Sequence, residues 1–304
     1  MMRKVIQIAD STQLVSLPRK WALQHGIKKG DEVEVAEEGN KIIISTESLA
    51  PLDKKEIDVS ELEPMILRAI VALYKKGVDE IKVTFNEPNL INSVQKLIGK
   101  EAVGFEITDQ GKNYCIIKQV SGELEDFDPL LRRTLLLLVS MADRTYEALK
   151  SGSQDELRNT AFLEEANNRF TTSCRRFLNK KGYPDSRKTG PLYYIVEELE
   201  NLADQYKYIC LHFSDGKKAV KINPEVISVF KKTNEILRSF CEIFYKYEPK
   251  KMAAIGKERK EIIKHMFRLL EKTKDHNDTV LLHYSITIFN KIFCLIGPYL
   301  VISL

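Results

Sequence analysis

The stretch that decides the fold of the N-terminal part is residues 11–35, STQLVSLPRKWALQHGIKKGDEVEV. It begins with a short apolar run ending at Leu17, which predicts a strand. Pro18 follows, at a position where the missing backbone N–H costs nothing in the first turn of a helix. Residues 19–25 predict about two helical turns, and Gly26 supplies the left-handed residue that ends them. The order is therefore strand, Leu-Pro, short helix and glycine turn.

Two further strands are predicted after this helix. Val33 and Val35 alternate with acidic residues, as in a half-buried strand, and residues 42–44 form an apolar run after the turn at Gly39 and Asn40. A unit of about fifty residues buries little apolar surface by itself, because small domains keep much of their surface exposed. We therefore expect two chains to associate through this unit.

Residues 1–48 resemble the AbrB/MazE/SpoVT family, whose members interleave two such chains into a DNA-binding dimer. The motifs that carry the resemblance are Leu17-Pro18, Gly26-Ile27 and Lys29-Gly30-Asp31 at the family's spacing. The resemblance implies a domain of swapped β-hairpins that dimerises and binds DNA. Two other uses stay open, namely a hairpin that serves only for dimerisation and one that captures a toxin as an antitoxin does.

Charge divides this N-terminal segment into two halves. Residues 1–30 hold six basic residues against one acidic residue, a net of about +5, whereas residues 31–47 hold one basic against six acidic residues. Affinity for duplex DNA rests on cations at phosphates, and discrimination rests on contacts to base edges. The candidates for phosphate contacts are Arg3, Lys4, Arg19 and Lys20. The candidates for contacts from the hairpin tip to bases or phosphates are Gln7, Ser11 and Gln13. A solvated basic surface is the alternative.

The composition is that of an ordinary globular protein. Two or three domains are expected for 304 residues, and 43% hydrophobic with 30% charged residues is enough to build a sizeable core. The five cysteines are odd in number and have no Cys-x-x-Cys spacing, which indicates reduced, buried thiols in the cytoplasm. No signal peptide is expected before the basic hairpin.

A linker is expected at residues 49–59, followed by a small α/β module at residues 60–122. Ser60 is predicted to cap the first helix of this module. Helical spacing over 65–73 and 90–98 encloses an alternating run at 81–85, and two strands are predicted on either side of the turn at 109–112. No phosphate-binding loop follows these strands. The sequence indicates no role for this module.

From residue 125 onward, apolar residues recur with the helical period. The predicted helices cover about 130–149, 154–181, 192–210, 226–247, 251–272 and 279–304. Three helices in each of two units, at about 125–214 and 222–304, indicate an internal duplication. The predicted fold class is therefore multi-domain α+β: an N-terminal hairpin domain, a small α/β module and an all-α pair of three-helix bundles.

The last predicted helix is apolar enough to raise the question of a membrane span. Asn290 and Lys291 lie at its centre and His283 near its start, and polar side chains there make a lone spanning helix costly. We expect a buried helix of the bundle and no membrane insertion. A tail that docks on a membrane partner is the alternative.

Residues 125–304 resemble PhoU, the regulator of phosphate uptake, whose domain is a pair of three-helix bundles. The segments that carry the resemblance are 164–169 (EEANNR), 175–178 (RRFL) and 200–204 (ENLAD). In that family, acids four residues apart bind metal ions. The resemblance therefore implies metal ligands, and the candidates here are Glu164, Asn168, Glu197, Glu200 and Asp204.

The spacing of these candidates agrees with a metal site, because residues four apart share one helical face and hard cations prefer oxygen ligands. The chain also departs from the family. Asn168 stands where an Asp is usual, and Ile286 and Asn290 fall where acids would recur in the second repeat. We expect a divalent or ferric ion at one site at most and no other cofactor. A solvated helix face, with the acids beside nearby lysines, is the alternative.

An enzyme is not expected. The five histidines lie apart in the sequence, and no nucleophile elbow or phosphate loop is present. The chain is predicted to be a cytoplasmic, homodimeric transcription regulator of phosphate homeostasis that binds double-stranded DNA, with the helical part as its sensor. A phosphate transporter or its ATPase is the partner that the PhoU resemblance implies. The alternative is an adapter that inhibits such a transporter, with the hairpin used only for dimerisation.

Overall fold

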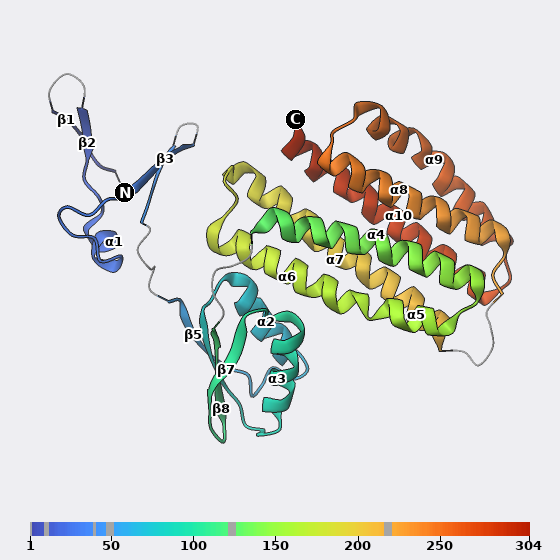
Figure 1. Ribbon diagram of the computed structural model, residues 1–304, viewed down its shortest axis with the longest axis horizontal. Helices are drawn as coiled ribbons and strands as arrows, with labels where there is room; N and C mark the ends of the chain where they lie inside the picture. Colours follow the sequence, from blue (N-terminus) through green and yellow to red (C-terminus); the bar gives the residue numbers. More distant parts are fainter. Residues whose placement is uncertain (1, 9–11, 39–40, 47–51, 121–125, 216–220) are drawn as a thin grey trace. The chain divides into compact units, whose positions relative to one another are not determined.

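The structure is a computed structural model that describes residues 2–8, 12–38, 41–46, 52–120, 126–215 and 221–304. The chain forms two compact units, Met1–Lys55 and Glu56–Leu304. The N-terminal unit contains the hairpins, and the second unit contains the α/β module together with the helical domain (Figure 1). Each unit is described by itself.

The N-terminal unit consists of two antiparallel hairpins with a short helix between them. Its elements are β1 (Val5–Ile8), β2 (Thr12–Val15), α1 (Arg19–Gln24), β3 (Glu34–Glu38) and β4 (Lys41–Ser45). Pro18 precedes the helix, and Gly26 adopts a φ of 67° just after it. The predicted strand, Leu-Pro, helix and glycine turn are therefore confirmed.

The described part of this unit does not contain a buried hydrophobic residue. Every residue of β1 and β2 is exposed, including Ile6 at 58% and Leu14 at 45% of their maximal surface. Ile42 and Ile43 of β4 are exposed as well. Apolar strands that remain in water contribute little to folding, since apolar burial is the main driving force. Within the described part of this unit, these apolar residues are left uncovered.

The α/β module is a four-stranded sheet with two helices. Its elements are β5 (Lys54–Asp58), α2 (Ile66–Lys76), β6 (Glu80–Thr84), α3 (Leu90–Glu101), β7 (Phe105–Gln110) and β8 (Tyr114–Gln119), and the strand order is β5-β6-β8-β7. Residues alternate between buried and half-buried along β6, so that Ile81 and Val83 share a core with Ile70 and Tyr74 of α2 and with Val94 of α3. The predicted module is present.

Two details of this region differ from the sequence-based expectation. The expected linker at 49–59 contains β5, which joins the sheet beside β6. Ser60 does not cap a helix but bonds to Asp58 through its backbone N–H and its hydroxyl, and α2 starts only at Ile66. Pro64 explains the late start, because the residue before a proline is disfavoured in helical conformation.

The helical domain is a bundle of long helices that run side by side (Figure 1). Its elements are α4 (Phe127–Ser151), α5 (Gln154–Ala161), α6 (Leu163–Lys181), α7 (Ser186–Ser214), α8 (Pro224–Tyr245), α9 (Pro249–Lys272) and α10 (His276–Ser303). The helix predicted over 154–181 is divided at Phe162 into α5 and α6. The two sets of three predicted helices are otherwise present.

Short polar side chains set several of the helix starts. Ser153, Asp185, Asn223 and Asp275 each accept a hydrogen bond from a backbone N–H of the first turn. Such caps satisfy donors that have no partner within the helix. Gly152, with a φ of 69°, ends α4.

Helix α10 is 28 residues long and apolar enough to cross a membrane by length and composition. It packs in the bundle, where Leu281, Leu282, Ile288, Phe289 and Ile292 are at most 1% exposed. The same core contains residues of α4, α7 and α8. This is the packing of a bundle helix, as expected.

Arg176 of α6 connects the helical domain to the α/β module through hydrogen bonds. Its guanidinium is fully buried and donates to the carbonyls of Tyr74 and Val78, at 2.8 and 2.7 Å, at the C-terminal end of α2. It also donates to Asp79 at 3.0 Å and Gln119 at 2.9 Å. The guanidinium lies 4.8 Å from the ring centre of Tyr74, a cation–π contact. The module and the bundle therefore form one folded unit.

Removal of the Arg176 guanidinium tests this attachment. We expect Arg176→Met to lower the free energy of unfolding by about 3–5 kcal/mol, because it leaves the Asp79 carboxylate buried beside fewer donors. Urea denaturation of the full chain measures the change. The matched control is Arg144→Met, since Arg144 forms an exposed ion pair with Glu156 and its loss is expected to cost less than about 1 kcal/mol. Equal losses in the two variants would contradict the assignment.

Candidate functional site

The first hairpin brings two of the predicted DNA-contacting residues together. Gln7 of β1 and Gln13 of β2 are register partners, so their side chains share one face of the ribbon, and both residues are exposed. Ser11, the third predicted tip residue, lies outside the described residues. The two glutamines therefore form an exposed amide pair near the end of the ribbon.

The opposite face of the same ribbon is apolar. Ile6, Ile8 and Leu14 alternate with the glutamines along the strands and are each at least 45% exposed. One face of the hairpin thus presents Ile6, Ile8 and Leu14, while the other presents the two glutamines beside Val5 and Val15, which are exposed as well.

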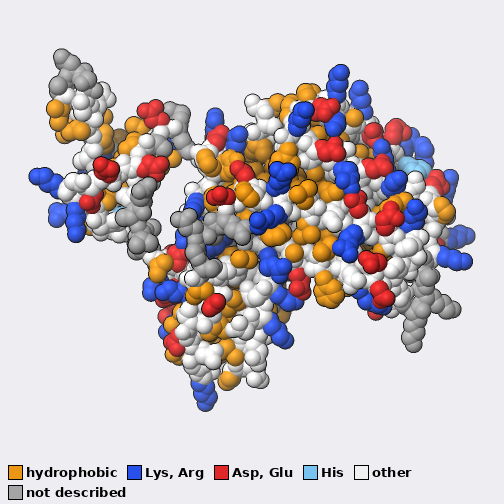
Figure 2. Space-filling view, in the orientation of Figure 1, with side chains coloured by type: hydrophobic (Ala, Val, Ile, Leu, Met, Phe, Trp, Pro, Cys, Tyr) orange, Lys and Arg blue, Asp and Glu red, His pale blue; other side chains and the backbone are white. Residues whose placement is uncertain are grey.

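The predicted phosphate contacts lie just before β1 and in the first turn of α1. Arg3, Lys4, Arg19 and Lys20 are all exposed. Among the described residues, Lys4, Arg19 and Lys20 make no ion pair. Blue side chains gather at one end of the N-terminal unit in Figure 2, whereas both signs are interspersed over the visible face of the bundle. Unpaired cations of this kind are available to a polyanion.

A second candidate region is the seam between α6 and α7, which contains the predicted metal ligands. Arg175 of α6 is 1% exposed and donates to the carboxylates of Glu197 and Glu200 on α7. Thr171 donates a further bond of 2.7 Å to Glu200. The guanidinium of Arg175 therefore joins these two acids.

Lys207 has the same role at the other end of the seam. Its Nζ donates to Glu164 Oε1 at 2.7 Å and to Asp204 Oδ1 at 2.6 Å. Asn168 also donates to Glu164, at 2.7 Å. Burial lowers the pKa of Lys207, but its bonds to Asp204 and Glu164 outweigh burial, so the net pKa lies above the ordinary value. Lys207 is therefore a cation at neutral pH.

The seam does not fit the metal site that the resemblance implied. The four predicted acids face each other across the two helices, but each bonds to Arg175 or Lys207. Within the described ranges, no three His, Cys, Asp or Glu side chains are placed to hold a metal ion. Asn168 Oδ1 is buried without a partner, but one amide oxygen falls far short of the six to eight ligands that a hard cation such as Ca²⁺ takes.

The second repeat contains no comparable acidic seam in its described part. Glu258 of α9 pairs with Lys232 of α8 at 3.0 Å, and His265 lies 3.6 Å from Glu225. The guanidinium of Arg259 on α9 lies 3.9 Å from the ring centre of Phe293 on α10. The two repeats therefore differ in their polar contacts.

Three histidines that are far apart in the sequence line one open pocket at the end of the bundle. His212 of α7 and His276 and His283 of α10 surround an apolar floor that includes Leu270 and Val280, in a volume of about 600 Å³. The rings of His212 and His276 are 5.6 Å apart. These three histidines, which lie apart in the sequence, meet because the packing of α7 and α10 brings the ends of these helices together.

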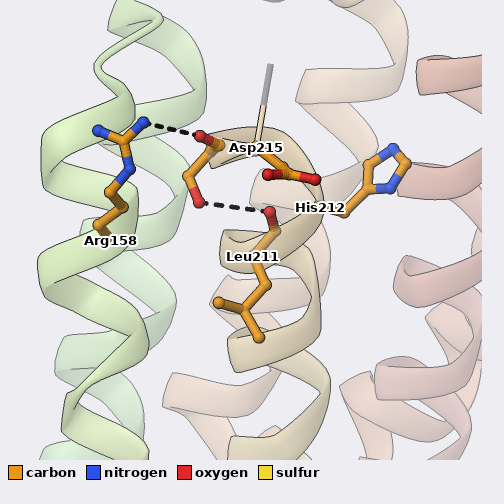
Figure 3. A pocket seen from close by; sticks show the side chains of 5 residues that line it. Arg158, Leu211, His212 and Asp215 are labelled. Atoms are coloured by element: carbon orange, nitrogen blue, oxygen red, sulfur yellow. Dashed lines mark hydrogen bonds between the residues drawn. The ribbon is translucent and has the colours of Figure 1, made fainter. Parts of the chain in front are cut away.

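His212 also lines a neighbouring polar pocket, which Figure 3 shows. Arg158 of α5 donates to the carbonyl of Ser214 at 3.0 Å, and the hydroxyl of Ser214 donates to the carbonyl of Leu211. These bonds tie α5 to the C-terminal end of α7. Asp215 lies at the rim, and its side chain makes none of the bonds drawn.

Comparison with known proteins agrees with this division of the chain. Residues 6–53 match the family described as "Antidote-toxin recognition MazE, bacterial antitoxin". The N-terminal unit is therefore a MazE-like domain. No curated protein sequence matches the chain.

The helical part has a counterpart among solved structures. The phosphate transport system regulatory protein PhoU from Streptococcus pneumoniae superposes with a TM-score of 0.50 at 15% identity, and the match covers 59% of this chain and 95% of that one. At this identity the similarity concerns the fold alone. The chain thus combines a MazE-like domain with a PhoU-like helical fold, as the sequence motifs indicated.

The sequence-based search missed the cations of the PhoU-like part. Arg175 lies eleven residues after Glu164, which is close to three helical turns, so both point to the same partner helix. Lys207 lies three residues after Asp204, on the same face of α7. Helical spacing would have placed both cations beside the acids, but it would not have shown that they bridge the two helices.

Lys75 of α2 gives the stability of the fold a measurable pH dependence. Burial and the charge of Arg175 lower the pKa of Lys75 from 10.5 to about 8. Below pH 8, Lys75 carries its charge in both the folded and the unfolded chain, and the buried charge destabilises the fold. This cost disappears as the pH rises from about 8 towards 10.5, where the unfolded chain also releases the proton.

We therefore expect Lys75→Met to be more stable than the wild type at pH 7, with a difference that shrinks between about pH 8 and pH 10.5. Urea denaturation at a series of pH values measures it. Lys76→Met, at the exposed next position, is the matched control for loss of a lysine side chain. A difference that stays constant across this pH range would contradict the assignment.

Proposed function

We propose that this chain is a homodimeric, DNA-binding transcription regulator of phosphate uptake. The observation that carries the proposal is the β1–β2 ribbon, which places the exposed Gln7–Gln13 pair on one face and leaves apolar residues uncovered on both faces, with Ile6 and Leu14 on the face opposite the glutamines. The unpaired cations Lys4, Arg19 and Lys20 lie close to this ribbon in the sequence. Cations supply affinity for phosphates, and glutamine is suited to the edge of adenine.

The same surface supports the proposed dimerisation. Exposed apolar residues recur on β1, β2, β3 and β4, and no buried core is present in the described part of the N-terminal unit. A second copy of the chain covers these residues with the same surface of its own. Symmetric homodimers of this kind are the commonest protein oligomers. The dimer also brings two sets of cations to one duplex.

The PhoU-like domain is proposed to be the regulatory part. Its solved counterpart is named a phosphate transport system regulatory protein, which motivates phosphate as the signal and a phosphate transporter or its ATPase as the partner. A partner that binds one arrangement of the chain more tightly than another shifts the population, and so changes the affinity for DNA. No catalytic step is proposed.

Selection of genomic fragments by the purified full chain tests the function directly. The expected outcome is enrichment of fragments upstream of phosphate-transport genes, with binding that weakens steeply as salt is added. Enrichment of a different set of genes would refute the phosphate assignment while leaving DNA binding in place. Binding to no fragment at all would refute the regulator.

The cations at the start of α1 are expected to carry much of the affinity for DNA. We expect Arg19→Ala with Lys20→Ala to weaken binding roughly 10- to 1000-fold and to reduce the salt slope by about 3 to 4, since a dimer loses four phosphate contacts. Fluorescence anisotropy with a labelled duplex over a series of salt concentrations measures both quantities. The matched control is Lys257→Ala with Lys260→Ala, which removes two exposed lysines from α9. Equal effects of the two variants would show that the affinity for DNA depends only on the net charge of the chain and not on these two positions.

The apolar face of the ribbon is expected to hold the dimer together. We expect Ile6→Lys with Leu14→Lys to convert the dimer into a monomer, because these cross-strand partners lose their apolar contacts. Sedimentation velocity of the full chain measures the change. Leu136→Lys on α4 is the control, since Leu136 is 62% exposed in the other unit. A dimer that survives the hairpin substitutions would place the interface elsewhere.

The family description favours a second candidate, in which the MazE-like domain captures a protein partner of toxin type. The related adapter hypothesis holds that the hairpins only dimerise and the PhoU-like domain inhibits a transporter. Both predict indifference to duplex DNA at every salt concentration. The salt series on the wild type therefore separates them from the regulator.

A further inference from the structure

The acids of the α6–α7 seam occur as two pairs, and each pair holds one cation. Arg175 joins Glu197 to Glu200, and Lys207 joins Glu164 to Asp204. Glu197, Glu200 and Asp204 belong to α7, and Glu164 belongs to α6. Each cation therefore does what a metal ion does at such a place, because it attracts carboxylates that would otherwise repel each other.

The cation at the first pair is permanent. An arginine guanidinium stays charged in proteins, and that of Arg175 is 1% exposed. Its Nε also donates to the carbonyl of Thr171 at 3.3 Å, which holds the group within α6. Loss of this pairing would leave a charge buried and uncompensated, a strongly unfavourable state.

The cation at the second pair is held as closely. The Nζ of Lys207 is 2.7 Å from Glu164 and 2.6 Å from Asp204, and the Lys207 side chain is 22% exposed. Glu164 is almost buried and accepts a further bond from Asn168. One oxygen of each carboxylate in this pair, Oε1 of Glu164 and Oδ1 of Asp204, is thus already bonded to Lys207.

We propose that Arg175 and Lys207 are built-in counter-cations, which hold the α6–α7 seam together without a metal ion and close it to divalent and ferric ions. The proposal does not depend on DNA binding. It makes this PhoU-like fold a bundle whose shape is independent of the supply of metal.

Metal titration of the wild-type full chain is the first test. We expect no stoichiometric metal by elemental analysis after incubation with Mn²⁺ or Fe³⁺ and gel filtration, and a melting temperature that agrees in EDTA and in Mn²⁺ to within about 1 °C. One tightly bound ion per chain, whose removal by EDTA lowers the melting temperature, would overturn the proposal.

Removal of the two cations is the second test. We expect Arg175→Met with Lys207→Met to melt at a lower temperature in EDTA and to gain roughly 5 °C or more in Mn²⁺ at a hundredfold excess over its dissociation constant. The four uncompensated carboxylates then provide hard oxygen ligands for the ion. Failure of Mn²⁺ to stabilise this variant would overturn the claim that the side chains replace an ion.

The control for the second test is Lys232→Met on α8. Lys232 lies within 4 Å of two acids, Glu235 and Glu258, but on a more exposed surface. Its removal is expected to give no response to Mn²⁺. If the double variant does not fold, Lys207→Met alone is compared with the same control, and the wild-type titration still decides whether the seam is closed to metal.

Discussion

The structure from residue 56 onward depends on two adjacent buried arginines in α6. Consecutive helical residues point about 100° apart, so Arg175 faces α7 while Arg176 faces the α/β module. A buried guanidinium must be paired, because an uncompensated charge in the interior is strongly destabilising. Glu197 and Glu200 meet this need on one side, and Asp79 with the carbonyls of α2 meets it on the other. Helix α6 therefore determines how α7 and the module dock.

The two units differ in how far they bury their apolar residues. The α/β module and the helical domain each enclose a hydrophobic core within one chain. The MazE-like unit leaves the apolar residues of its strands in water. In the proposed function this difference has a use, since the same hairpins that need a second copy also carry the residues for DNA. Dimerisation and DNA binding would then be coupled through the same strands, and the PhoU-like domain would be free to bind a partner.

Local patterns predicted most of the elements. The 3.6-residue period gave the long helices of the bundle, and Leu17-Pro18 with Gly26 gave α1 and its end. Errors arose where a neighbouring segment overrides the local pattern. The charged run that forms β5 has little apolar character and becomes a strand because it pairs with β6. The break at Phe162 is not marked by a glycine or a proline.

The sequence by itself determined the helical periods, the basic character of residues 1–30, the strands and turns of the hairpins, and the positions of the acids at 164, 197, 200 and 204. These features follow from residue types and their spacing along the chain. Only the tertiary structure decided what those acids bind and which histidines meet. Arg175 and Glu200 are 25 residues apart, and His212 and His276 are 64 apart. Contacts over such separations form only after the helices pack, because local backbone geometry relates residues no further than a few turns apart.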